Sequence, residues 1–174
     1  MVNHRLLGAN LRVYDIANNE CVWINEFLRD RTFVVRVRES TSAHRLACSG
    51  VPQGSVLGPL LFLVFINDVT KDVDSPCWLF ADDLKLMSAG SAIEGVQQDV
   101  HALGVWANAW DLPFNAKKCQ HLALVCPENP LQIVDEQNAP HDIAHCRVVR
   151  DLGVQISADF KPALQCAAAA AKVR

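Results

Sequence analysis

Residues 77–86 read Cys-Trp-Leu-Phe-Ala-Asp-Asp-Leu-Lys-Leu, an apolar run that two adjacent acids interrupt before alternation resumes. Short apolar runs with these residue types are typical of strands. The stretch predicts a buried hairpin with Asp82 and Asp83 at its tip. Two carboxylates so close together repel each other, so the pair favours a hard divalent cation. An ordinary solvated turn is the alternative interpretation.

The stretch Gly50-Val51-Pro52-Gln53-Gly54-Ser55 is dense in chain-breaking residues and precedes the apolar residues 57–66. Because residues 57–66 are apolar all round, they predict a helix at the buried centre of the fold. Gly50 and Gly54 allow close backbone approach. Gln53 offers an amide near a helix N-terminus, where free N–H groups favour phosphate. The alternative is a plain turn into a core helix.

The remaining patterns predict an α+β fold, an antiparallel sheet with helices packed on one face. Strand 31–38 is predicted to be half-buried and to form a hairpin with residues 45–49, which sets Arg36 and Arg38 together on the exposed face. The other expected elements are helices at 20–29, at 93–110 behind a Ser91–Glu94 capping box, and at 166–173, strands at 121–126 and within 147–156, and a loop at 127–142.

Composition sets limits on the function. The chain has 174 residues, enough for one domain, and a net charge of −3, which lacks the strongly basic balance of many nucleic-acid binders. Residues 51–113 carry two lysines against eight acids, whereas both flanks are mildly basic. Any nucleic-acid chemistry must therefore come from local residues, although an acidic centre also suits a cation site reached by a polyanion.

Seven cysteines without a Cys-x-x-Cys pair indicate reduced thiols and an intracellular protein, in cytoplasm or nucleus. A zinc site from Cys119, His121 and Cys126 with His141 or His145 is conceivable, but the spacing fits no standard ligand pattern. The longest apolar run, 56–66, falls short of the about 20 residues that cross a bilayer, and no signal peptide is visible.

Taken as a set, the motifs resemble the reverse transcriptases of non-LTR (LINE-like) retrotransposons. Residues 49–68 resemble the B motif of that family, and Phe80-Ala81-Asp82-Asp83-Leu84-Lys85-Leu86 resembles its C motif. Further similarities are Trp106, Trp110, Leu112, Phe114-Asn115 and Lys118-Cys119 to the D motif, Asp151-Leu152-Gly153-Val154 to the segment leading to the thumb, and Trp23-Ile24, Phe27-Leu28 and Arg31 to the stretch before B.

The resemblance implies part of a right-hand polymerase: residues 1–160 as an incomplete palm without fingers, and residues 161–174 as the start of a thumb or connection helix. It implies RNA-directed DNA polymerisation with an RNA template, a DNA primer and deoxynucleoside triphosphates. Two Mg²⁺ ions, with Mn²⁺ as an alternative, are held in that family by carboxylates of the A and C motifs.

Carried over residue by residue, Asp82 is the metal ligand and Asp83 its supporting partner. Pro52, Gln53 and Gly54 are the shelf under nucleotide and template. The resemblance makes Lys118 similar to the lysine that protonates the leaving pyrophosphate. Arg36 and Arg38 are candidates for contacts with backbone phosphate, and an exposed strand face is the alternative.

One departure concerns the A motif, which reads Phe-Asp-x-Val-x-His in the family, whereas the chain begins Met1-Val2-Asn3-His4. The matching aspartate would precede Met1, so the resemblance predicts little or no activity. If this alignment holds, Val2 lies on a strand beside the Asp82 hairpin, with Met1 facing the metal site. Asp15 stands where the family has a glycine.

Two other functions stay open. One is a non-catalytic palm-fold remnant that binds nucleic acid or has no function. The other is an RNA-dependent RNA polymerase palm, against which Ala81, in place of the glycine usual before those acids, and the Pro-Gln-Gly segment both argue.

Overall fold

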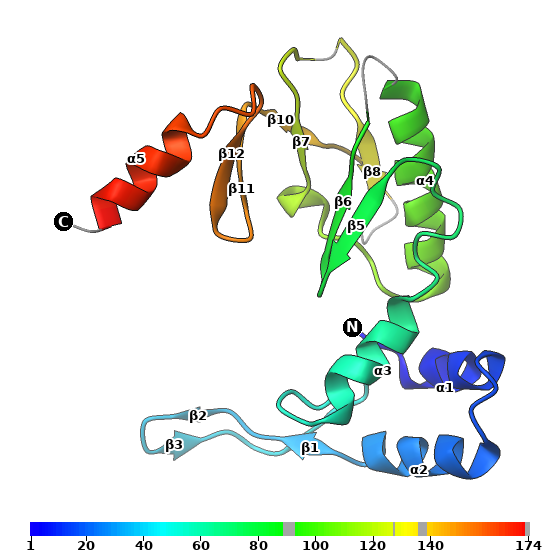
Figure 1. The fold of residues 1–174 in the computed structure, drawn as a ribbon. Helices are drawn as coiled ribbons and strands as arrows, with labels where there is room; N and C mark the ends of the chain where they lie inside the picture. The colour runs from blue at the N-terminus through cyan, green and yellow to red at the C-terminus, as the bar shows by residue number, and fades with distance from the viewer. Residues whose placement is uncertain (89–92, 127, 136–138, 173–174) are drawn as a thin grey trace.

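The computed structural model describes residues 1–88, 93–126, 128–135 and 139–172 (Figure 1). The helices are α1 (His4–Val13), α2 (Asn18–Leu28), α3 (Leu57–Ile66), α4 (Ile93–Ala109) and α5 (Ala163–Lys172), with a 3-10 turn η1 (Ala116–Lys118). The strands are β1 (Thr32–Phe33), β2 (Arg36–Val37), β3 (Ser40–Thr41), β4 (Arg45–Leu46), β5 (Cys77–Phe80), β6 (Asp83–Leu86), β7 (Gln120–Leu122), β8 (Gln132–Val134), β9 (Pro140–Asp142), β10 (Ala144–Cys146), β11 (Val148–Asp151) and β12 (Val154–Ser157). The mixed α+β composition is confirmed.

The predicted single antiparallel sheet is wrong for the described residues. Their strands form separate two-stranded ladders, and β7 pairs with β10 in parallel while the other pairs are antiparallel. Strands of two to four residues supply few main-chain hydrogen bonds each, and such short ladders do not extend into a wide sheet.

Helix α3 packs against α1 and α2 to form the first hydrophobic core. Leu61 and Phe65, one turn apart on α3, are buried against a cluster that includes Leu7 of α1 and Leu28 of α2. The opposite face is open: Leu60 and Leu63 are 55% and 56% exposed. The central helix is therefore confirmed, whereas its burial on all sides is not. No described helix is long and apolar enough to cross a bilayer.

Helix α1 was missed from the sequence, although its signals are present. The Asn3 side chain accepts hydrogen bonds from the backbone N–H groups of Arg5 and Leu6 and so caps the helix. Leu7 and Leu11, four residues apart, are both buried. The predicted helix at 20–29 is confirmed as α2.

Residues 31–49 form the predicted hairpin but not a half-buried strand. β1 pairs with β4 and β2 with β3, and the residues of these four strands are exposed. Figure 1 shows this hairpin projecting from α2 and α3 as an arm. Alternation in the sequence identified the strand but not what covers it, because an arm that projects from the body buries neither face.

Helix α4 organises the second core. Its Val100 packs in a cluster with Leu131, Ile133 and Ile143. The Gln97 side chain holds β8 by bonding both the N–H and the carbonyl of Gln132, at 2.8 and 2.9 Å.

Several of the predicted elements after residue 90 need correction. The expected loop at 127–142 contains strands β8 and β9. The strand at 121–126 is confirmed only as β7, and the strand pieces in 147–156 and the C-terminal helix are confirmed as β11, β12 and α5. Ser91 of the predicted capping box lies outside the described residues.

A buried aspartate joins α4 to the chain that enters β5. The Asp99 carboxylate, 3% exposed, accepts hydrogen bonds from the backbone N–H groups of Asp74 at 2.8 Å and Ser75 at 3.1 Å. Burial raises the pKa of Asp99, but the hydrogen bonds from Ser75 and Asp74 outweigh it and hold that pKa below its ordinary value. The charged form therefore stabilises the approach to the β5–β6 hairpin.

We expect Asp99→Asn to lower the free energy of unfolding by about 1–3 kcal/mol, because an amide cannot accept both N–H bonds. A carboxylate whose folded pKa is depressed contributes stability above its unfolded pKa of about 3.9 and loses it as pH falls through the folded value. We therefore expect urea unfolding of wild type and Asp99→Asn across pH 2.5–7 to show a difference in the free energy of unfolding that is constant near neutrality. This difference should shrink below about pH 4. The exposed Asp72→Asn is the control. A pH-independent difference would contradict this role.

Candidate active site

The acid pair lies where β5 turns into β6. The two strands are antiparallel, and Phe80 faces Asp83 across the ladder. Ala81 and Asp82 form the turn, and Ala81 has a φ of 53°. A β-branched residue at this position would be strained. The predicted hairpin with two acids at its tip is confirmed.

The hairpin is more exposed than the sequence predicted. Trp78, Leu79 and Phe80 are 51%, 42% and 60% exposed, and Asp82 and Asp83 are also exposed. Within the described residues β5 and β6 pair only with each other, and an isolated two-stranded ladder buries little surface. The expected buried setting of the acid pair is therefore wrong, and both carboxylates face solvent.

The chemistry of the two side chains fits a divalent cation. Carboxylate oxygens are the ligands that Mg²⁺ prefers, and this ion commonly uses one or two of them while it keeps several waters. An exposed turn leaves room for those waters. In the part of the chain that the structure describes, no group of three or more His, Cys, Asp or Glu side chains is placed to hold a metal. A cation at Asp82 and Asp83 would take its other ligands from water or substrate.

The alternative zinc set is likewise not assembled among the described residues. The parallel pairing of β7 with β10 does bring His121 beside His145, with ring centroids 6.0 Å apart. Burial and the neighbouring His145 both lower the pKa of His121. The Cys119 thiol donates instead to the carbonyl of Asn115 within its own turn.

The segment before α3 is a tight turn that caps the helix. Ser55 donates from its hydroxyl to the carbonyl of Pro52 at 2.7 Å, and the same hydroxyl accepts from the N–H of Gly58 at 3.0 Å. A Cβ on Gly58 would stand 2.7 Å from the Pro52 carbonyl oxygen, so this position requires glycine. Gln53 and Gly54 lie exposed at the turn, and Gly54 has a φ of +79°. Sequence reasoning missed the parts played by Ser55 and Gly58.

The first residues of the chain contact this segment. The Gly50 N–H donates to the carbonyl of Val2 at 2.7 Å, and His4 Nε2 lies 2.7 Å from the Gly50 carbonyl oxygen. Val2 is buried but lies on no strand, so the expectation of a strand beside the Asp82 hairpin is wrong. Asp15 has a φ of 53°, the left-handed conformation that suits the glycine expected at its position.

The other predicted residues lie on separate elements. Lys118 is exposed at the end of η1. Arg36 and Arg38 are exposed together as predicted, with Arg36 Nε donating to the Arg38 carbonyl at 3.3 Å, although Arg38 lies in the turn after β2. Figure 1 places that turn at the outer end of the arm, apart from the β5–β6 hairpin.

A contact between α3 and α4 was not predicted. Trp106 Nε1 of α4 donates to Asp68, just beyond α3, at 3.0 Å. Trp110 meets Phe65 of α3 edge to face, with ring centroids 5.2 Å apart. The sequence marked all four residues as parts of motifs, but it carried no signal of which pairs meet.

The comparisons with known proteins agree with these motifs. A family model described as reverse transcriptase (RNA-dependent DNA polymerase) matches residues 2–156. The chain is 36% identical over 113 residues to the "Probable RNA-directed DNA polymerase from transposon BS" of Drosophila melanogaster. It is 35% identical over 111 residues to the "RNA-directed DNA polymerase from mobile element jockey" of the same species.

These alignments cover 55% and 57% of the chain but only 12% of each relative, so the chain matches about one eighth of their length. The family match, in contrast, spans most of the chain. The resemblance to the reverse transcriptases of non-LTR retrotransposons is thereby confirmed, and the chain belongs to the reverse transcriptase (RNA-dependent DNA polymerase) family.

Proposed function

We propose that the chain supplies the palm of an RNA-directed DNA polymerase and that the β5–β6 turn is its catalytic centre. The observation that carries this proposal is the acid pair at the tip of an antiparallel hairpin, within a chain of the reverse transcriptase family. Residues 1–160 would form the palm and residues 161–174 the start of the thumb. The substrates would be an RNA template, a DNA primer and deoxynucleoside triphosphates.

Asp82 in the turn is the proposed metal ligand and Asp83 at the start of β6 its supporting partner. Because Asp82 lies in the turn and only Asp83 belongs to a strand, strand alternation does not set the directions of the two carboxylates. In this proposal Asp82 faces the cation and Asp83 its flank. Mg²⁺, or Mn²⁺ in its place, would supply positive charge to the primer hydroxyl and the triphosphate. The chain's own part is to hold two carboxylates at a solvent-open turn where substrate oxygens complete the coordination.

Pro52, Gln53 and Gly54 are the proposed shelf under nucleotide and template. The Ser55 hydroxyl donates to the Pro52 carbonyl, which stabilises the turn without ligand. The exposed Gln53 amide is then available to a base or sugar, and Gly54 adds no side chain to the approach. Lys118 is the proposed proton donor to the leaving pyrophosphate. The seven free cysteines support an intracellular setting.

A second candidate function applies to the 174-residue chain by itself: binding of primer–template without extension. It is favoured because the acid pair belongs to no group of three metal-binding side chains in the described residues. Two-metal transfer uses carboxylates from more than one motif to balance the charge that develops on phosphate. The chain alone would then keep the fold and the nucleic-acid surface but not the turnover.

We expect Mn²⁺ to bind at the turn and Asp82→Asn to weaken that binding at least about tenfold, because a first ligand is lost. Paramagnetic broadening of the backbone amide signals of residues 80–84 during a Mn²⁺ titration measures it directly. Asp72→Asn, an exposed acid outside the hairpin, should leave the titration unchanged. Equal broadening in wild type and Asp82→Asn would overturn the assignment.

We expect the purified chain to bind a labelled primer–template but not to extend it in Mg²⁺ and deoxynucleotides, as resolved on a sequencing gel. Template-dependent products that disappear in Asp82→Asn would contradict the second candidate and confirm the first. Products that persist in Asp82→Asn would indicate a contaminating polymerase.

We expect Arg36→Ala and Arg38→Ala each to reduce the slope of log Kobs against log salt for primer–template binding by about 0.7–0.9, if each arginine neutralises one phosphate. Arg29→Ala is the matched control, because Glu26 and Asp30 already pair with that guanidinium. A slope change in the control but not in the arm variants would exclude the arm as a phosphate contact.

A further inference from the structure

A salt bridge joins the candidate catalytic hairpin to the next hairpin along the chain. Lys85 of β6 bridges to Asp151, the last residue of β11, through Nζ and Oδ1. The two side chains are 34% and 26% exposed, whereas the pairs of Arg29 with Glu26 and Asp30 and of Lys161 with Asp159 join side chains that are 41% to 80% exposed. Solvent and salt screen a partly buried pair less than an exposed one. We therefore expect this pair to contribute more to stability than an exposed pair does.

The salt bridge lies close to the turn of each hairpin. Lys85 lies two residues after Asp83, and residues two apart share one face of a strand at a spacing of about 7 Å. Asp151 immediately precedes the turn of Leu152 and Gly153, which have φ values of 46° and 87°. The contact therefore ties the tip of the β11–β12 hairpin to β6 at a position two residues after Asp83.

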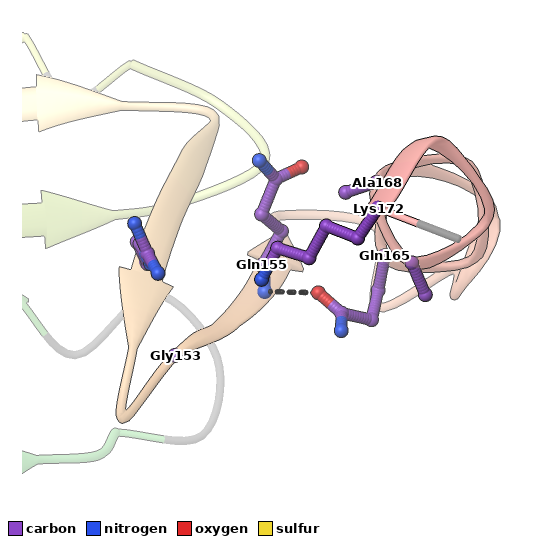
Figure 2. Close-up of a pocket in the computed structure, with 7 residues that line it drawn as sticks. Gly153, Gln155, Gln165, Ala168 and Lys172 are labelled. Atoms are coloured by element: carbon purple, nitrogen blue, oxygen red, sulfur yellow. Dashed lines mark hydrogen bonds between the residues drawn. The ribbon is translucent and has the colours of Figure 1, made fainter. Parts of the chain in front are cut away.

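The β11–β12 hairpin in turn holds α5. The N–H of Gln155 on β12 donates to Oε1 of Gln165 on α5 at 2.8 Å (Figure 2). Figure 2 also shows Gly153, Ala168 and Lys172 on the walls of a shallow pocket between the hairpin and the helix. Helix α5 is thus attached to the hairpin, and the hairpin to β6 by the salt bridge.

We infer that Lys85 and Asp151 are positioning residues that set the place of β11–β12, and with it α5, relative to the Asp82–Asp83 turn. The inference rests on the proposed function only in that this turn is taken as the reaction centre. β11 also lies beside β7. Loss of the pair should therefore loosen the hairpin locally and leave the fold intact.

Hydrogen–deuterium exchange of the 174-residue chain tests this inference. In Lys85→Met and in Asp151→Asn, amides of residues 148–157 should exchange up to about fivefold faster, the upper range for such a pair. Amides of α5 should also exchange faster, whereas the exchange rates of amides in α1 to α3 should stay unchanged. The double variant should exchange no faster than either single variant, because the two changes remove one shared interaction. Lys85→Arg keeps the charge and should retain most of the protection.

Two controls make the result specific. Lys71→Met removes an exposed lysine outside both hairpins and should change nothing at residues 148–157. Gln165→Ala should speed exchange in α5 without doing so in β11, because it cuts only the second link. Additive effects in the double variant, the same effect from Lys71→Met, or no effect from either single variant would overturn the inference.

Failure of this inference is distinguishable from failure of the proposed function. Asp82→Asn should leave exchange at residues 148–157 unchanged, whatever its effect on cation binding. Equal Mn²⁺ broadening in wild type and Asp82→Asn, together with non-additive effects in the Lys85→Met/Asp151→Asn double variant, would reject the catalytic site and retain the salt bridge as a positioning device. Weaker Mn²⁺ broadening in Asp82→Asn together with additive effects in the double variant would retain the catalytic site and reject the positioning role.

Discussion

One face of α3 is buried against α1 and α2, and contacts at the end of this helix join it to α4. Phe65 is fully buried where α3 packs against α1 and α2. Burying a side chain of this size contributes about 2–3 kcal/mol. Just beyond the helix, Asp68 accepts the Trp106 N–H and so ties α3 to α4. α4 in turn holds the approach to β5 through Asp99. The acid pair is thus placed by a series of buried and partly buried contacts, although it is itself exposed.

The buried helices form the scaffold, whereas the proposed catalytic residues lie outside the buried core. The residues that carry the proposed reaction lie on turns: Asp82 between two strands, Gln53 and Gly54 before α3, and Lys118 at the end of η1. Two of these turns carry local hydrogen bonds: the Ser55 hydroxyl donates to the Pro52 carbonyl, and the Lys118 N–H donates to the Asn115 carbonyl. Turns on a fixed scaffold can expose polar groups that a strand or helix would commit to its own hydrogen bonds. The acidic middle of the chain, unpromising for nucleic acid on average charge, thereby gains a local role.

Sequence reasoning succeeded where the signal was local. The β5–β6 hairpin, α2, α3 and α4 followed from periodicity and turn residues, and the motifs identified the family. Sequence reasoning failed where the burial or pairing of a residue depends on residues distant in the sequence. Alternation in residues 31–38 could not report that the arm projects from the body, and the apolar residues of α3 could not report that Leu60 and Leu63 are exposed. The salt bridge of Lys85 with Asp151 joins strands 66 residues apart, and neither strand alone indicates it.

We propose Asp82 and Asp83 as the cation-binding centre of a reverse transcriptase palm. Anomalous diffraction from crystals of the chain grown with Mn²⁺ would locate the bound ion itself. We expect an anomalous peak within coordination distance of a carboxylate oxygen of Asp82, with Asp83 on its flank. Ordered carboxylates at the turn without such a peak, at a Mn²⁺ concentration that saturates the titration, would contradict it.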